Sequence, residues 1–341
     1  MAGALRGARH FCWNAQAMAK GLSIDEQVIA LGRVRTDPAS DATRETLKKA
    51  LAAKSNLLAA KAAELASGLR LAGLLPDIER AFPRFFSDGD KGCTAKTSLA
   101  KAMEAFNSDA EELFLRGVRH VQMEAVWGGS TDVAVELRAT CAPALARLNT
   151  RRALPALTDL LGDADPSARA AAAQALGHIG RPEGALPLRL LIRLGDNDSA
   201  VMVECFSALL KILGDEAIPL VEPFLDTRQA ELSDSAATAL GESRLPAAYE
   251  LLRNRFDREI TAEGRRALLF GMALSRRPES LEFLLRVIDE ENGPTAAYAV
   301  ASLAIYKNDI AVRERVRTVV DARDDGAIAE EFQRRFPPRS V

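Results

Sequence analysis

The chain has 341 residues, more than one hydrophobic core usually serves, so it contains either several globular domains or one repetitive architecture. Hydrophobic residues make up 48% of the sequence and aromatic residues only 5%, so the apolar content is mostly Ala and Leu. These residues favour closely packed helices and disfavour a β-rich fold. With a formal net charge of −2, neither half of the chain is strongly basic, so we expect no nucleic-acid partner.

The cysteines are few and widely separated, without CxxC spacing or a neighbouring histidine: Cys12, Cys93, Cys141 and Cys205. This spacing is not that of a zinc or iron–sulfur site. We therefore expect buried thiols in a reducing compartment, a cytoplasmic location, and no metal or cofactor. No run of about 18 apolar residues occurs, so no segment is predicted to span a membrane.

The N-terminal residues 1–21 are basic and poor in acidic residues, and we expect them to form a loosely ordered extension, with Met18 as an alternative start. A secretory signal is disfavoured because no continuous apolar stretch of the required length is present. An organellar presequence remains an alternative, although the segment lacks the Ser content of such signals. A helix is predicted near residues 22–34.

Apolar anchor positions then recur along the chain at intervals of 29 to 34 residues, with one longer interval of 42. The anchors are Leu69, Met103, Leu145, Leu176, Leu209, Leu240, Leu274 and Leu303. A period of this size is typical of helix–turn–helix units that cannot bury their apolar faces alone and therefore stack. Repeats are predicted at about 41–73, 74–107, 108–149, 150–180, 181–214, 215–244, 245–277 and 278–308.

The longer interval contains an insertion, residues 117–131, with the sequence GVRHVQMEAVWGGST, which is predicted to lengthen the connection between two helices. It concentrates the candidate binding residues Arg119, His120, Gln122, Glu124 and Trp127. As a recognition loop, it would present Trp127 on a tight turn at Gly128 and Gly129, and Trp and Arg are residues that anchor interfaces.

The alternative for the same insertion is packing. Its apolar side chains would fill a gap between repeats, and its polar groups would satisfy the loop backbone: Val118, Val121, Met123, Val126 and Trp127 are the residues concerned. Packing is slightly favoured, since a lone Trp in a helical repeat more often packs than binds.

The helix boundaries are clearest in the segment Ala153 to Gly180. Pro155 and Pro166 lie in the opening turns of two predicted helices, and Asp165 caps the second. Charged residues also recur at fixed distances before the apolar anchors. Thirteen residues before successive anchors stand Asp90, Asp132, Asp163 and Asp196, and seven before them stand Lys96, Arg138 and Arg169.

The sequence ALPALTDLLGDADPSARAAAAQALGHIG resembles the short bacterial HEAT repeats that are also found in phycobilin lyase subunits, closely over residues 150–215. Period and resemblance together predict an all-α fold, a right-handed α-α superhelix of about eight helix pairs. The resemblance implies a structural ladder of contacts between adjacent repeats, formed by Asp132, Arg138, Asp163 and Arg169. In the last two repeats Ile260 and Ala267, then Glu290 and Ala296, occupy the ladder positions, so the ladder is predicted to stop there.

The predicted domain organisation is an extension at 1–21, a repeat solenoid at 22–308, and a helical cap and tail at 309–341. The cap is rich in Arg, Asp and Glu, as expected for a solenoid that must end on a polar face.

No catalytic constellation is apparent, because the histidines His10, His120 and His178 are scattered and neither a His-Glu pair nor a phosphate-binding loop occurs. The one enzymatic candidate is a cluster of Arg119, His120 and Glu124.

We therefore predict a non-enzymatic bacterial scaffold or adaptor that is a monomer. It would bind a protein partner through the concave face lined by the second helices, through the 117–131 loop, or through both. A phycobilin-lyase-like subunit and a nucleic-acid-binding helical-repeat protein of the DNA glycosylase kind are the alternatives.

Overall fold

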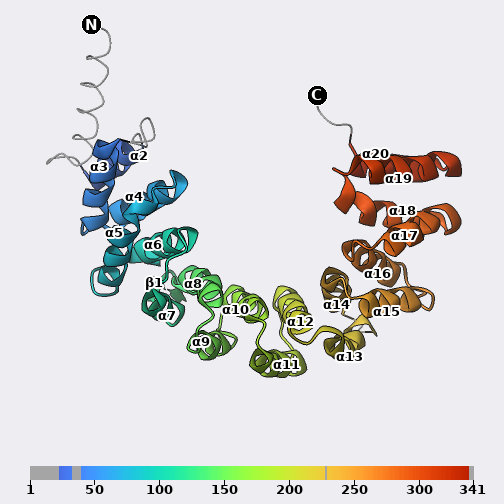
Figure 1. Ribbon diagram of the computed structural model, residues 1–341, viewed down its shortest axis with the longest axis horizontal. Coiled ribbons are helices and arrows are strands. Elements are labelled where there is room, and N and C mark those ends of the chain that lie inside the picture. Colours follow the sequence, from blue (N-terminus) through green and yellow to red (C-terminus); the bar gives the residue numbers. More distant parts are fainter. Residues whose placement is uncertain (1–22, 33–39, 227–228, 338–341) are drawn as a thin grey trace, which may run out of the picture. The chain divides into compact units, whose positions relative to one another are not determined.

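The computed structural model describes residues 23–32, 40–226 and 229–337, and the predicted extension at 1–21 lies outside these residues. The chain divides into two compact units, residues 1–175 and 176–341. Figure 1 labels the helices of both. The helices of the first unit are α2 (Ile24–Gly32), α3 (Asp41–Ala52), α4 (Asn56–Gly68), α5 (Leu75–Ala81), α6 (Thr94–Ala105), α7 (Glu111–Val118), α8 (Val135–Leu148) and α9 (Ala153–Leu160). Helix α10 (Pro166–Ile179) crosses the boundary.

The second unit continues the alternation of first and second helices. It contains α11 (Ala185–Leu194), α12 (Ser199–Leu213), α13 (Ile218–Val221), α14 (Ala230–Ser243), α15 (Pro246–Phe256), α16 (Ala262–Leu274), α17 (Pro278–Glu290), α18 (Gly293–Leu303), α19 (Ile310–Arg323) and α20 (Gly326–Arg335). Short 3₁₀ helices join them: η2 (Ala72–Leu74), η3 (Phe82–Phe86), η4 (Lys91–Cys93), η5 (Pro182–Gly184), η6 (Gly214–Ala217), η7 (Glu222–Asp226) and η8 (Ala304–Tyr306).

The helices pair in sequence order, and within the described residues eight successive pairs run from α3–α4 to α17–α18. Within each unit the second helices stack on one another, α4 on α6 and α6 on α8 in the first, and α12, α14, α16 and α18 in the second. The predicted all-α solenoid of about eight helix pairs is confirmed. A further pair occupies the segment predicted as a cap, with α19 packed on α17 and α20 on α18.

Helix ends follow the local chemistry of the sequence. Ser40, Ser55 and Asn292 accept hydrogen bonds from the first-turn amides of α3, α4 and α18, which satisfies backbone donors that have no partner inside the helix. Asp165 accepts from the amide of Ser167 at 2.8 Å, as predicted for the cap of α10. These caps fix where each repeat turns.

Glycines set how closely the second helices of the second unit approach. A Cβ atom on Gly241 of α14 would lie 2.0 Å from the carbonyl oxygen of Gly271 in α16, and one on Gly271 would lie 2.4 Å from the carbonyl oxygen of Ala237. Because the obstacle is backbone, it cannot rotate out of the way. The stacking of α14 on α16 therefore requires residues without a side chain at these positions.

We expect Gly241→Ala to lower the free energy of unfolding by at least about 1–3 kcal/mol, the usual cost of overpacking a core. The control is Gly68→Ala at the exposed end of α4, where an added Cβ meets nothing within 4 Å. That substitution should leave stability unchanged or raise it by about 0.4–1 kcal/mol, since it removes backbone freedom from the unfolded chain. Urea unfolding followed by circular dichroism measures both, and equal effects would contradict the assignment.

Candidate functional site

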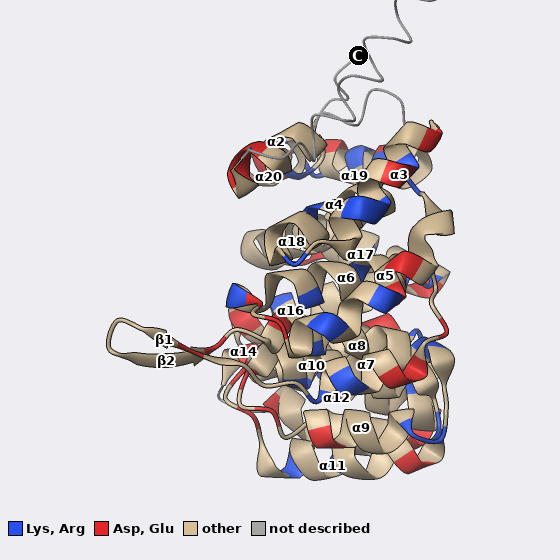
Figure 2. Cartoon of the chain, turned by 90° about the vertical axis from the view of Figure 1, so that its left-hand side faces the viewer, with Lys and Arg blue, Asp and Glu red and all other residues tan. Residues whose placement is uncertain are grey.

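The insertion forms a β-hairpin between α7 and α8, where a loop was predicted. Strands β1 (Met123–Val126) and β2 (Gly129–Asp132) pair antiparallel, with Met123 opposite Asp132 and Val126 opposite Gly129. The two-residue turn is Trp127–Gly128, and Gly128 has a φ of 91°, a conformation that favours glycine. Figure 2 shows the hairpin projecting away from α7 and α8.

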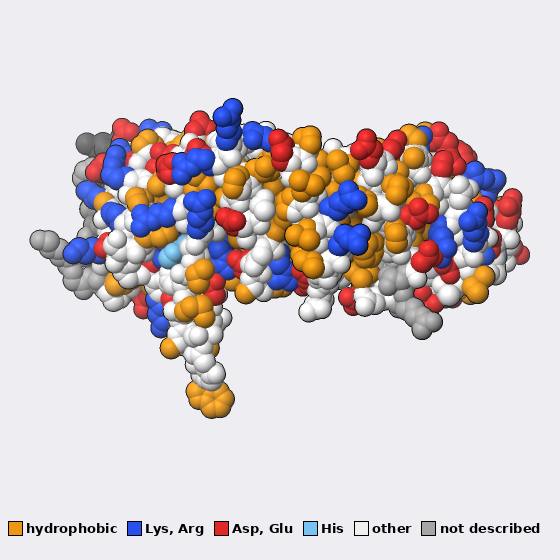
Figure 3. Space-filling model, turned by 90° about the horizontal axis from the view of Figure 1, so that it is seen from below, with side chains coloured by type: hydrophobic (Ala, Val, Ile, Leu, Met, Phe, Trp, Pro, Cys, Tyr) orange, Lys and Arg blue, Asp and Glu red, His pale blue; other side chains and the backbone are white. Residues whose placement is uncertain are grey.

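The apolar side chains of the hairpin face solvent. Trp127 is fully exposed, with 104% of its reference area accessible, and Val121, Met123 and Val126 are each about half exposed. Of the residues considered for packing, only Val118, inside α7, is buried. The interpretation of Trp127 as a packing residue is therefore wrong. In Figure 3 the hairpin stands out from the surface with a hydrophobic group at its end.

Two of the predicted binding residues hold the base of the hairpin rather than facing outward. The Gln122 side-chain amide donates to the carbonyl oxygen of Asp90 and to Glu124 Oε1, both at 2.7 Å. Glu124 Oε1 also accepts from the amide of Gly92 at 2.7 Å. Gln122 and Glu124 thus bind the hairpin to η4 of the preceding repeat. Asp90 is one of the acids that recur thirteen residues before an apolar anchor. Nothing in the sequence indicated its contact with the hairpin.

His120 belongs to a small aromatic and cationic cluster. Its ring meets Phe86 edge-on, with 4.8 Å between centroids, and the Arg116 guanidinium lies 4.0 Å from the centre of the same Phe86 ring. Burial lowers the pKa of His120 below its ordinary value of 6.5, with smaller contributions from the nearby cations Lys96 and Arg116. Gln122 links His120 to Glu124, since its Oε1 lies 3.3 Å from His120 Nε2 and its amide donates to Glu124. Arg119 is exposed at the C-terminal end of α7 and takes no part in this chain of hydrogen bonds.

Arg138 links the hairpin to two repeats. Its guanidinium, only 4% exposed, donates to Asp132 at 2.6 Å and to Asp163 at 2.7 and 2.9 Å, and a further bond of 2.9 Å reaches the carbonyl oxygen of His120. Burial alone would raise the pKa of Asp132, but the amides of Gln122 and Ala134 and the Arg138 guanidinium hold that pKa below its usual value.

Related contacts recur along the chain with different residues. A buried Lys96–Asp90 pair, 3.2 Å apart, stands one repeat before the Arg138–Asp132 pair. In the following repeat Arg169 donates to the carbonyl oxygens of Asp163 and Ala164 at 2.9 and 3.0 Å. Each cation thus ties the start of its second helix to the turn before it.

The prediction that these contacts stop before the last two repeats is wrong for the repeat at 245–277. Arg265 donates to the Glu259 carbonyl oxygen at 2.8 Å and pairs with Glu291 at 2.9 Å. Glu259 and Arg265 are six residues apart, as are Asp132 and Arg138. The anchor of this repeat is the buried Met272, not Leu274. Thirteen and seven residues before Met272 stand Glu259 and Arg265, so the predicted ladder positions, Ile260 and Ala267, were one and two residues too far along the chain.

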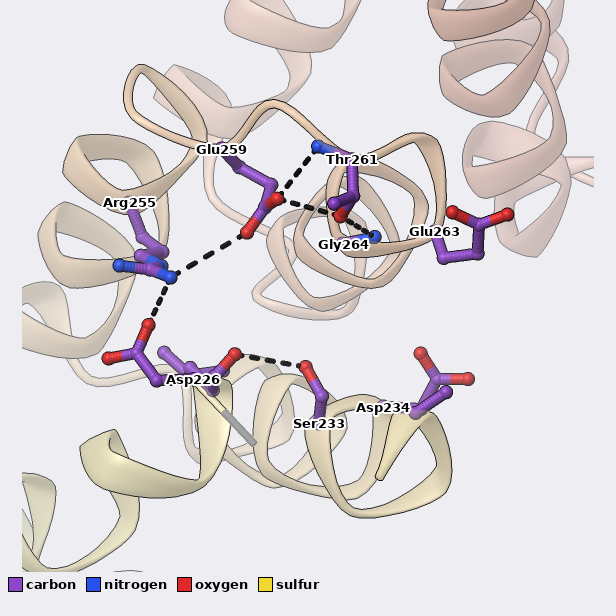
Figure 4. A pocket seen from close by; sticks show the side chains of 10 residues that line it. Asp226, Ser233, Asp234, Arg255, Glu259, Thr261, Glu263 and Gly264 are labelled. Atoms are coloured by element: carbon purple, nitrogen blue, oxygen red, sulfur yellow. Dashed lines mark hydrogen bonds and ion pairs between the residues drawn. The ribbon is translucent and has the colours of Figure 1, made fainter. Parts of the chain in front are cut away.

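The second unit has a groove of about 440 Å³ between the start of α14, the end of α15 and the start of α16 (Figure 4). Arg255 lies between Asp226 and Glu259 and pairs with both, and Glu259 also accepts from the amide and hydroxyl of Thr261 at 2.8 and 2.7 Å. These groups are occupied with one another in holding the turn before α16. No three His, Cys, Asp or Glu side chains of the described residues are placed to hold a metal ion.

Cys93 and Cys141 are poor nucleophiles. Burial raises the pKa of Cys93 to about 11, and burial also raises the pKa of Cys141 strongly. Because the thiolate is the reactive form, neither thiol is activated at neutral pH. Cys205 is likewise buried, and Cys12 lies outside the described residues.

Residues 130–202 match the family model of HEAT repeats, a segment that contains Arg138, Asp163 and Arg169. The predicted resemblance to HEAT repeats is thereby confirmed, and the fold is that of a helical-repeat protein. No curated protein matches the chain in sequence. None of the helices in the described part of the chain is long and apolar enough to cross a membrane.

Solved structures are similar in fold. A model of the full-length AP-3 complex in an intermediate open conformation aligns with 86% of this chain and 53% of its own, at 15% identity and a TM-score of 0.52. Kap121p aligns with 96% of this chain and 42% of its own, at 13% identity and a TM-score of 0.48. The complex of CpcE and CpcF of phycocyanin lyase from Nostoc sp. PCC7120 aligns over 72% of this chain and 94% of its own, at 21% identity and a TM-score of 0.41.

Replacing Arg138 tests the connection between repeats. We expect Arg138→Ala to lower the free energy of unfolding by about 3–5 kcal/mol, because it leaves two partly buried carboxylates without their cation. Lys101→Ala is the control, since its pair with Glu136 is exposed on both sides and is worth less than about 1 kcal/mol. Urea unfolding of both variants at neutral pH gives the comparison, and similar losses would show that Arg138 has no special role.

His120 should make stability depend on pH. Its pKa is lower in the folded chain than in the unfolded chain, so the unfolded chain binds the proton first as the pH falls below about 6.5. The stability that neutral His120 contributes is present above that value and is lost as the pH falls toward the folded pKa. We expect the stability difference between the wild type and His120→Gln to shrink from pH 8 to pH 5.5 in urea unfolding experiments. A constant difference would mean that burial does not shift this group.

Proposed function

We propose that the chain is a non-enzymatic scaffold or adaptor that binds a protein partner, with the hairpin of residues 123–132 as its recognition element and Trp127 as the anchor. The full exposure of Trp127 at the tip of a held hairpin is the observation that carries the proposal. Tryptophan is among the residues most enriched in interface hot spots, where one side chain contributes a large share of the binding free energy.

The base of the hairpin supports this role because it is already ordered. Gln122, Glu124 and Asp132 each make hydrogen bonds of 2.6 to 3.0 Å that tie the strands to η4 and α8. A recognition element that is held before binding loses less conformational entropy when the partner arrives. Gln122 and Glu124 therefore act as positioning residues, and Trp127 makes the contact.

The composition of the tip indicates the chemistry of the partner site. Residues 125–131, AVWGGST, contain no charged residue, and Met123 and Val126 add apolar area beside Trp127. Such a tip fits an apolar pocket with hydrogen-bonding groups at its rim. Arg119, exposed at the end of α7, offers a cation for a contact outside that pocket.

The face of the second helices is the other predicted surface, and its charges in the first unit largely pair with one another. Lys61 pairs with Glu64 at 3.2 Å, and Lys101 of α6 pairs with Glu136 of α8 at 2.6 Å. A partner on that face would have to compete with these pairs. We therefore assign the main contact to the hairpin and a supporting one to the second helices.

The test is affinity capture with the intact chain beside Trp127→Ala, with partners quantified by mass spectrometry. Loss of a hot-spot tryptophan costs about 2 kcal/mol or more, so a partner bound through it should be depleted about 30-fold. Ile260→Ala is the matched control, because Ile260 is 92% exposed and lies far along the chain in the second unit.

A partner that is retained by the wild type and Ile260→Ala but lost with Trp127→Ala supports the proposal. Equal capture by all three proteins would remove Trp127 as the anchor. The chain has two tryptophans, so Trp13→Phe makes Trp127 the only indole fluorophore. A blue shift of its emission on adding the captured partner would place the contact at the hairpin tip, and unchanged emission would place it elsewhere.

A further inference from the structure

Helix α11 carries two apolar faces. Ala185, Leu188 and Ile192 are buried against the neighbouring helices, as expected for a repeat helix. A second row, Leu186, Leu190 and Leu194, is 71%, 60% and 75% exposed. Its spacing of four residues places the three leucines in one line along the helix. We call this row the leucine stripe.

The other first helices of the same unit do not share this pattern. The outward positions of α15 are taken by Ala247, Glu250 and Asn254, and those of α17 include Glu282 and Arg286. A single exposed leucine is ordinary on a protein surface, but three in a row on one helix form a continuous apolar strip. The leucine stripe is thus not a general property of the repeat.

Two arginines flank the stripe. Arg189 and Arg193 are exposed and lie one turn from Leu186 and Leu190 on the same helix. Neither has a hydrogen bond or ion pair among the described residues, whereas Arg255, Arg265, Arg266 and Arg315 in the same unit all pair with acids. Figure 3, which views the chain from below, shows hydrophobic and basic side chains side by side on its surface. The surface is therefore apolar and positively charged.

The size of this surface favours a single helix over a second copy of the chain as the binding partner. A helix of ten residues is about 15 Å long, and its three exposed leucines and two arginines are few beside the roughly 20–30 residues that each partner contributes to a stable dimer interface. Arg189 and Arg193 would also repel their counterparts in an antiparallel pairing of two α11 helices. One amphipathic helix fits both the length and the charge.

We propose that the leucine stripe of α11 is a second docking site, which binds an amphipathic α-helix with apolar residues on one face and Asp or Glu beside them. The partner's apolar positions lie along Leu186, Leu190 and Leu194, and its carboxylates pair with Arg189 and Arg193. This site is independent of the hairpin, since it lies in the other unit and uses different chemistry.

The test uses two synthetic helices of about 18 residues, long enough to match α11, with leucines on one face and either Glu or Lys on the flanks. Fluorescence anisotropy of the labelled peptides against the full chain measures affinity. We expect the Glu peptide to bind at least about tenfold more tightly than the Lys peptide, with the preference reduced by salt. Arg189→Glu with Arg193→Glu should reverse the preference, and Leu190→Ser should weaken both peptides.

The control is Ile310→Ser, which removes an exposed apolar residue at the start of α19 and should change nothing. All substituted side chains are exposed, so circular dichroism should show unchanged folding. The proposal is overturned if the Glu peptide does not bind, if it binds equally well to Leu190→Ser, or if the charge reversal leaves the preference intact. A concentration-dependent dimer that Leu190→Ser abolishes, seen by sedimentation, would assign the stripe to a second copy and would likewise overturn it.

Discussion

The position of the hairpin depends on one buried guanidinium. Arg138 joins Asp132 at the end of β2, Asp163 in the next repeat and the backbone at His120, so the same side chain fixes both the stacking of two repeats and the exit of the insertion from the helices. Burying a cation costs free energy unless all of its donors form hydrogen bonds. Here the three guanidinium nitrogen atoms donate to three acceptor groups, the carboxylates of Asp132 and Asp163 and the carbonyl oxygen of His120. The repeat can therefore carry an insertion without losing its contact with the next repeat.

Regularity made most of the fold predictable. The helix pairs could be located from the period of about 31 to 34 residues, the prolines and the capping acids. Each of these signals depends on residues that are close together in the sequence. The predicted register of the repeats was wrong where either of two nearby apolar residues could be the anchor. Leu274 and Met272 are both apolar and two residues apart, and only burial shows that Met272 occupies the anchor. The contacts of Arg265 could not be found until that shift was known.

The hairpin was not predictable in the same way. Its strands have four residues each and include Glu, Gly, Ser and Asp, so strand propensity is weak, and the Gly128–Gly129 pair was the available signal. The exposure of Trp127 depends on how far the strands carry it from α7 and α8, which no local pattern determines. The leucine stripe was missed for a related reason, since an apolar residue in a helix is assigned to the core unless its face is known. Both surfaces stand out only when residue type and exposure are compared.

The buried thiols make it possible to measure the local unfolding of each unit separately. Cys93 and Cys141 lie in the first unit and Cys205 in the second, and all three are shielded from solvent. An alkylating reagent can modify them only when the surrounding helices separate, so the rate of modification measures local unfolding rather than thiol chemistry. Partner binding that stabilises one unit would slow labelling there and leave the other unchanged. The sequence thus contains a natural set of probes for whether repeat proteins of this kind open as a whole or one part at a time.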